Sequence, residues 1–81
     1  MGEHILIVDD DAGIRDSMLE FITRSGYNAQ TASSAEEAIE LIKSTRVDLV
    51  ITDIILPGKN GLQLTDLIKQ NYDIDIIVMT G

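Results

Sequence analysis

The chain has no cysteine and few basic residues. The absence of cysteine among its 81 residues excludes disulfide bonds and thiolate sites for metals or redox chemistry. Lys and Arg together number 6 against 14 Asp and Glu, which leaves a formal charge of −8. This charge argues against direct contact with nucleic acid, because the phosphates would be repelled. It suits a cation or a basic partner surface.

Long apolar runs are also absent. The longest, such as Ile5-Leu6-Ile7-Val8, contain four residues, so we expect no membrane-spanning segment. The N-terminus Met1-Gly2-Glu3-His4 lacks the cationic and apolar regions of a signal peptide. We therefore expect a soluble, cytoplasmic domain. Its 44% hydrophobic content is enough for a core, although a chain this short buries only roughly 60% of its unfolded surface.

Hydrophobic periodicity predicts strands that alternate with helices. The expected strands are 5–8, 27–32, 47–53 and 76–80, and the expected helices are about 11–25, 35–44 and 62–71. The residues expected on the buried sides of the helices are Ile14, Met18, Leu19, Phe21 and Ile22, then Ala35, Ala38, Ile39 and Ile42, then Leu64, Leu67 and Ile68. This alternation predicts an α/β fold, a doubly wound parallel sheet with helices on both faces.

The last expected strand has no helix or strand after it. Its row Ile76-Ile77-Val78-Met79 would form an exposed apolar edge, which proteins usually avoid. We therefore expect the chain to be a piece of a longer domain, or this edge to be covered by something else.

Oxygen-bearing side chains stand at the carboxyl ends of three expected strands. Asp9 and Asp10 end the first strand, Asp53 the third and Thr80 the fourth. Ligands of open parallel sheets bind outside these strand ends. If the first and third strands are neighbours, their ends lie about 5 Å apart, and three carboxylates share one small pocket.

Such a cluster of carboxylates needs a counter-charge. No Lys or Arg stands at a strand end, and a hard divalent cation such as Mg²⁺ is the obvious solution. With the cation bound, Asp53 becomes a carboxylate able to attack a phosphoryl group, and Thr80 could hydrogen-bond the transferred oxygens. Each acid alone has a simpler interpretation, since Asp10 or Asp11 can cap a helix and Asp53 can form a turn.

These residues resemble the receiver domain of two-component response regulators. The matching segments are Ile5–Asp11, Asp48–Gly61 and Ile77–Gly81, and the likeness covers the whole chain. The Leu56-Pro57-Gly58 and Val78-Met79-Thr80-Gly81 sequences look most like receivers of NtrC-type transcription activators. The resemblance implies a flavodoxin-like fold with sheet order 2-1-3-4-5.

The resemblance also implies roles for individual residues. Asp53 would accept a phosphoryl group from a sensor histidine kinase or phosphotransfer protein. Asp9 and Asp10 would hold Mg²⁺ with Asp53, and Ile55 would add its backbone carbonyl. Thr80 would be the switch hydroxyl. Such a module catalyses only its own phosphorylation and dephosphorylation and is not a turnover enzyme.

The chain departs from the family at its end. Receivers carry a Lys at the end of a fifth strand, whereas the last Lys here is Lys69, inside the third expected helix. We therefore expect residues 1–81 to be the N-terminal two-thirds of a receiver domain, with an output domain beyond residue 81 and impaired phosphoryl transfer by this piece alone. We also expect a homodimer, with or without exchanged elements, in which another copy covers the last strand or the third helix.

Two other functions compete with this one. Asp9-Asp10-Asp11 after an apolar strand also resembles the nucleophile motif of haloacid-dehalogenase-type phosphatases, in which Asp9 would be the nucleophile and Asp11 the acid/base. Ala12 stands where that family has Thr or Val. The other alternative is a receiver-like module that is not phosphorylated and only dimerises, which the missing Lys supports.

Overall fold

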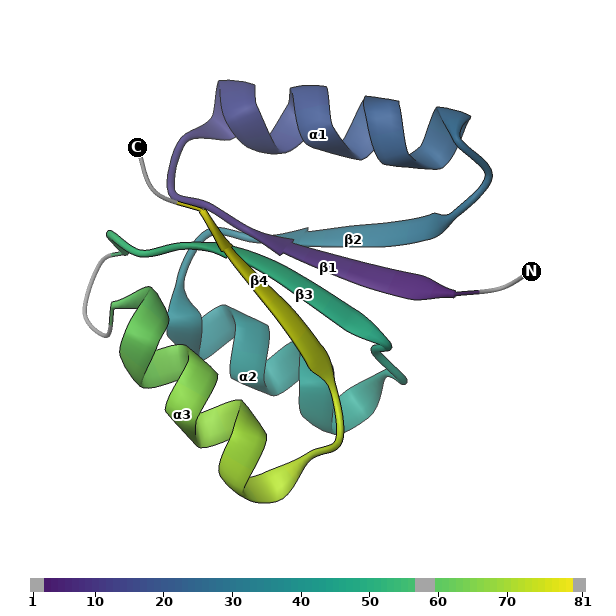
Figure 1. Cartoon of the computed structure of the whole chain (residues 1–81). Helices are drawn as coiled ribbons and strands as arrows, with labels where there is room; N and C mark the ends of the chain where they lie inside the picture. Colours follow the sequence, from purple (N-terminus) through teal and green to yellow (C-terminus); the bar gives the residue numbers. More distant parts are fainter. Residues whose placement is uncertain (1–2, 57–59, 80–81) are drawn as a thin grey trace.

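The fold is a parallel sheet between two layers of helices. The computed structural model describes residues 3–56 and 60–79 (Figure 1). Its elements are β1 (His4–Val8), α1 (Ala12–Arg24), β2 (Asn28–Ala32), α2 (Ala35–Ser44), β3 (Leu49–Asp53), α3 (Gly61–Asn71) and β4 (Asp75–Met79). The strands are parallel and lie in the order β2-β1-β3-β4. This confirms the predicted doubly wound, flavodoxin-like architecture, with β1 and β3 as central neighbours.

Alternate residues of the central strands face opposite helix layers. Leu6, Val8 and Val50 point toward α2 and α3 and belong to the larger apolar core. Ile5 and Ile7 point the other way and pack with Ile22 of α1. Burial on both faces explains why β1 is an uninterrupted β-branched and leucine run.

Helix α1 buries a narrower stripe than the periodicity predicted. Ile22 is buried and Met18 and Leu19 pack beside it, but Ile14 is 45% exposed and Phe21 73% exposed. At 100° per residue, Ile14 and Phe21 project from one flank of the helix, well away from the direction of Leu19. The prediction that these two side chains are buried is therefore wrong. The inward stripes predicted for the other helices are confirmed at Ala35, Ala38, Ile42, Leu64 and Ile68, while Ile39 and Leu67 are half-buried.

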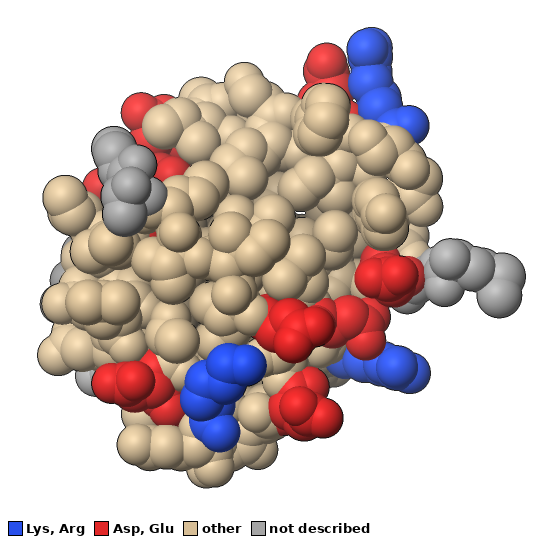
Figure 2. Space-filling model, in the orientation of Figure 1, with Lys and Arg blue, Asp and Glu red and all other residues tan. Residues whose placement is uncertain are grey.

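Strand β4 lies at the edge of the sheet, with one face incompletely covered. Helix α1 packs over β1 and β2, and Ile77 on the same sheet face of β4 is 52% exposed. Figure 2, drawn in the orientation of Figure 1, shows a broad surface without charged side chains across the middle of this view. The expected exposed apolar edge is therefore present.

Within the described residues, none of the helices combines the length and apolarity needed to cross a bilayer.

The helix ends follow local side-chain chemistry. Asp11 caps α1 by accepting hydrogen bonds from the backbone N–H groups of Gly13 and Ile14 at 2.8 and 3.2 Å. Helix α3 begins with a capping box in which Asn60 and Gln63 bond each other's backbone. These caps set where the loops at the carboxyl edge of the sheet enter the helices.

Candidate metal centre

Three carboxylates meet at the carboxyl edge of β1 and β3. Val8 pairs with Thr52 in the parallel register, so Asp9, the next residue after β1, lies beside Asp53, the last residue of β3. Asp10 follows in the turn toward α1. One carboxylate oxygen from each of Asp9, Asp10 and Asp53 lies within 4.8 Å of the others. The structure thus brings together the three acids that the sequence placed at these strand ends.

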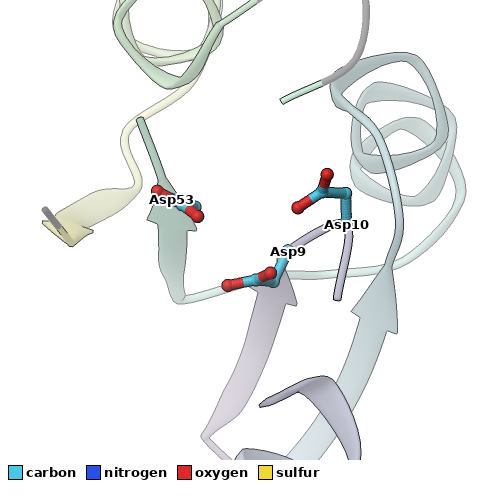
Figure 3. A group of neighbouring side chains, drawn as sticks. All are labelled: Asp9, Asp10 and Asp53. Carbon is cyan, nitrogen blue, oxygen red and sulfur yellow. The ribbon is translucent and has the colours of Figure 1, made fainter. Parts of the chain in front are cut away.

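The three acids differ in their surroundings. Asp9 is only 2% exposed, Asp53 is half-buried and Asp10 is exposed to solvent. Figure 3 shows their side chains around a common space, with Asp10 and Asp53 on either side of it and Asp9 at its base. A cation entering from solvent would therefore meet Asp10 and Asp53 before Asp9.

Backbone hydrogen bonds hold two of these carboxylates. Oδ1 of Asp9 accepts from the N–H of Asp11 at 2.9 Å, and Oδ1 of Asp53 accepts from the N–H of Ile55 at 3.3 Å. The hydroxyl of Thr52, which is fully buried, donates to the carbonyl of Asp53 at 2.9 Å. Each oriented carboxylate retains lone pairs for a further ligand.

The donor set fits Mg²⁺. This ion takes oxygen ligands at about 2.0–2.1 Å, so ligands on opposite sides of it lie about 4 Å apart. Oxygens of Asp9, Asp10 and Asp53 that all lie within 4.8 Å of one another can approach this arrangement through small side-chain adjustments. Three clustered negative charges repel one another at this distance, and a divalent cation removes that repulsion.

The other predicted site residues have different outcomes. Asp11 does not join the cluster, because its carboxylate is the N-cap of α1. Ile55 directly follows this edge of the sheet, and its apolar side chain is 75% exposed. The group that Ile55 can offer the metal centre is therefore its backbone carbonyl. Thr80 lies outside the described residues.

Sequence reasoning missed Arg15. Its Nη1 donates a 2.7 Å hydrogen bond to the backbone carbonyl of Asp9, which brings a guanidinium beside the acidic turn. Arg15 does not stand at a strand end but reaches the turn from the helix. A signal was available, because a cation in the first turn of a helix is disfavoured by the helix dipole and indicates a compensating contact.

Gly61 touches the backbone of Asp53. Its N–H donates to the carbonyl of Ile54 at 2.6 Å, and a Cβ built on it would collide with the carbonyl oxygen of Asp53. The start of α3 therefore packs directly under the end of β3, and only glycine allows this approach.

A hollow in the described residues lies away from the three acids. It measures about 430 Å³ and is lined by Ile39, Ile42, Lys43, Leu67, Ile68, Asn71 and Tyr72. These residues lie toward the C-terminal ends of α2 and α3, whereas the acids lie near the opposite ends of the helices. This hollow is therefore separate from the metal centre.

Comparison with known sequences relates the chain to one protein family. The model of the response regulator receiver domain matches residues 5–81. The chain is 33% identical over 77 residues to the transcriptional regulatory protein AfsQ1 of Streptomyces coelicolor, covering 95% of this chain and 34% of the relative. It is 39% identical over 78 residues to the transcriptional regulatory protein YvrH of Bacillus subtilis, covering 95% and 33%. The chain thus spans about a third of the length of these curated relatives.

Solved structures of similar fold support the same family assignment. A signal receiver domain of an HD domain-containing protein from Pseudomonas fluorescens superposes with a TM-score of 0.96 at 32% identity, over all of this chain and 66% of that one. TrrA from Thermotoga maritima, solved in complex with Mg²⁺-BeF, gives a TM-score of 0.87 at 39% identity, over 96% and 69%. A complex of histidine kinase ThkA with TrrA gives 0.92 at 39% identity, over 98% and 69%.

Proposed function

The chain belongs to the response regulator receiver domain family of two-component systems, and on this premise we propose that Asp53 is its phosphoacceptor. The observation that carries the proposal is the meeting of Asp9, Asp10 and Asp53, with oxygens within 4.8 Å of one another. Asp53 is the member that ends a central strand and remains half-exposed, so an incoming phosphoryl group can reach it.

The proposed reaction transfers a phosphoryl group from a phosphohistidine to Asp53. A carboxylate oxygen of Asp53 attacks the phosphorus, the P–N bond breaks, and its electron pair leaves with the imidazole, which takes up a proton. The N–H of Ile55 orients the carboxylate through its 3.3 Å bond to Oδ1. The buried hydroxyl of Thr52 fixes the adjoining carbonyl. Thr80 is proposed to hydrogen-bond the transferred phosphoryl oxygens.

We propose that Asp9, Asp10 and Asp53 hold Mg²⁺, together with the backbone carbonyl of Ile55. When bound, Mg²⁺ supplies the positive charge that screens the repulsion between the carboxylate and the incoming phosphoryl group. The fit of the three carboxylates to this ion supports the assignment, as does the Mg²⁺-BeF complex of the similar protein TrrA.

Partners follow from the relatives. ThkA, which binds TrrA, is a histidine kinase, and we propose a sensor histidine kinase or phosphotransfer protein as the phosphodonor of this chain. AfsQ1 and YvrH are transcriptional regulators, and we propose an output domain that regulates transcription beyond residue 81. The narrower NtrC-type assignment is supported by the Leu56-Pro57-Gly58 and Val78-Met79-Thr80-Gly81 sequences.

A further proposal concerns the assembly. We propose a second copy of the chain as the cover for the exposed face and edge of β4, since Ile77 is 52% exposed there. Sedimentation equilibrium should then give a dimer mass that falls to the monomer mass in Ile77→Asp. A monomeric parent chain would refute this proposal without affecting the phosphoacceptor.

We propose that the module is not a turnover enzyme. A dehalogenase-type phosphatase would need Asp11 free as an acid/base, whereas the Asp11 carboxylate accepts two backbone hydrogen bonds as the cap of α1. Release of phosphate from a phosphate ester that depends on Asp9 and persists in Asp53→Asn would restore the phosphatase as the better candidate.

The test uses the full gene product that carries these residues. It is incubated with a small phosphodonor and Mg²⁺, and its intact mass is measured with and without hydroxylamine, which cleaves acyl phosphates. We expect the mass of one phosphoryl group to be added, and hydroxylamine to remove it. Residues 1–81 alone should label more slowly.

Two variants make the test specific. Asp53→Asn should abolish the added mass while circular dichroism shows the fold retained. The control is Asp75→Asn, which removes an exposed carboxylate at the amino ends of the strands, away from the metal centre. This variant should label like the parent protein. Labelling that survives in Asp53→Asn would refute the assignment of the phosphoacceptor, whereas a parent protein that takes no label at all would favour the receiver-like module that only dimerises.

A further inference from the structure

The side chain of Arg15 reaches the main chain of the acidic turn. Arg15 lies in the first turn of α1 and is half-buried, and its Nη1 donates to the carbonyl of Asp9 at 2.7 Å. Hydrogen bonds from a charged donor are roughly twice as strong as neutral ones. The contact also offsets the unfavourable position of a cation at the N-terminus of a helix.

This contact fixes the peptide unit that joins Asp9 to Asp10. Because a peptide is planar, holding the carbonyl of Asp9 also sets the direction of the N–H of Asp10 and the point from which its side chain departs. The peptide on the N-terminal side of Asp9 is held as well, because the N–H of Asp9 donates to the carbonyl of Ala32 at 3.1 Å. Asp10 is exposed, so the position of its carboxylate depends on this backbone.

The charge of Arg15 also reaches the first turn of α2. The pKa of Glu37 is lowered by hydrogen bonds from the backbone and hydroxyl of Ser33, at 2.7 and 2.9 Å, and to a smaller extent by the guanidinium of Arg15. The guanidinium therefore lies near enough to the start of α2 for its charge to favour the ionised form of Glu37.

We propose that Arg15 is a positioning residue of the metal centre, which holds the Asp9–Asp10 peptide so that the Asp10 carboxylate is arranged before Mg²⁺ arrives. The inference rests on the proposed function, because it concerns the same ion. Groups that orient metal ligands from outside typically change metal affinity by 10–100-fold when they are removed. We expect Arg15 to lie near the lower end, about tenfold, because it acts on backbone rather than on a ligand atom.

The test is a Mg²⁺ titration by isothermal titration calorimetry at constant ionic strength. Arg15→Gln should bind Mg²⁺ about tenfold more weakly than the parent chain. The matched control is Arg24→Gln on the same helix, which removes the same charge from a side chain that is 80% exposed and pairs with Glu20 at 3.9 Å. The control should bind like the parent, and Arg15→Lys, which keeps a charged donor, should recover most of the affinity.

A structural role alone predicts a different result, in which stability falls and metal affinity does not. Circular dichroism identifies the folded variants, and Arg15→Met, which keeps the aliphatic stem, replaces the Gln variant if that protein does not fold. For variants that fold only marginally, the readout is the Mg²⁺-dependent rise in the unfolding temperature, which reports affinity through mass action.

The outcomes separate this inference from the proposed function. Parent-like or tighter Mg²⁺ binding by a folded Arg15→Gln or Arg15→Met protein overturns the positioning role and leaves the metal centre intact. Failure of Arg15→Lys to recover affinity also overturns it. If the parent chain itself does not bind Mg²⁺, or if Asp10→Asn binds it equally well, the metal centre fails and the inference fails with it.

Discussion

Replacing Gly61 by alanine should displace the backbone that carries Asp53. A Cβ at position 61 would lie 2.9 Å from both the carbonyl carbon of Asp53 and the Cα of Ile54, and closer still to the carbonyl oxygen of Asp53. Carbon atoms pack at about 3.5–4.0 Å, so the start of α3 and the end of β3 must separate by at least about half an ångström. The atoms in contact are backbone, which cannot rotate away as a side chain can.

The cost of this separation can be estimated. Forcing an extra methyl group into a packed site costs about 1–3 kcal/mol. The 2.6 Å hydrogen bond from Gly61 to the carbonyl of Ile54 would weaken as well, and such a bond contributes about 0.5–1.5 kcal/mol. Alanine has a higher helix propensity than glycine, which offsets part of this loss in the free energy of unfolding. We therefore expect Gly61→Ala to lower the free energy of unfolding by about 2 kcal/mol and to weaken Mg²⁺ binding.

The assay is urea unfolding followed by circular dichroism, with a Mg²⁺ titration of the folded protein. Gly13→Ala is the matched control, because its Cβ would lie 3.2 Å from a side-chain oxygen of Asp11, which can shift by a few tenths of an ångström. The control should stay within about 1 kcal/mol of the parent chain. Parent-like stability and Mg²⁺ affinity in Gly61→Ala would refute the close approach of α3 to Asp53.

Three further changes test other parts of the account. In metal-free buffer, Asp53→Asn should raise the free energy of unfolding by about 1 kcal/mol, because it removes one of three repelling charges, and urea unfolding with a chelator would contradict this if stability fell. Hydrogen bonds from Ser33 lower the pKa of Glu37 in the folded chain, so this carboxylate stabilises the fold above its ordinary pKa and the effect is lost as pH falls through the lowered value. The stability difference between the parent and Glu37→Gln should therefore vanish on acidification, and a difference independent of pH would argue against the contact. Leu64→Ala removes a fully buried side chain and should cost about 2–5 kcal/mol in urea unfolding, whereas an equal loss in Leu62→Ala, at a position 55% exposed, would contradict the assigned core.

Much of the site could be predicted because it depends on strand topology. Parallel strands end at the same edge, so the apolar runs that stop at Asp9 and Asp53 place these acids together once β1 and β3 are neighbours. Asp10 is predicted at the same place because it is the next residue in the turn after Asp9. These positions are a consequence of chain direction and periodicity, both of which are visible in the sequence.

Other features depend on contacts through space. Periodicity indicates which side of α1 is apolar but not the centre of the buried stripe, so it predicts that Ile14 and Phe21 are buried although they flank that stripe. The bond from Arg15 to the Asp9 carbonyl and the approach of Gly61 to Asp53 join segments through backbone atoms. Backbone contacts leave little trace in residue type, apart from a glycine without a side chain or a cation in an unfavourable helix position.

The most direct test of the central claim replaces Mg²⁺ by paramagnetic Mn²⁺, which accepts similar oxygen ligands, and measures line broadening in the amide NMR spectrum of the chain. The account predicts that low Mn²⁺ concentrations broaden the amide signals of Asp9, Asp10 and Asp53 together, while those of Asp48 and Asp75 at the opposite edge of the sheet remain sharp. Broadening that follows the acidic side chains over the whole surface, or that reaches Asp10 without Asp53, would contradict a single cation centre formed by the ends of β1 and β3.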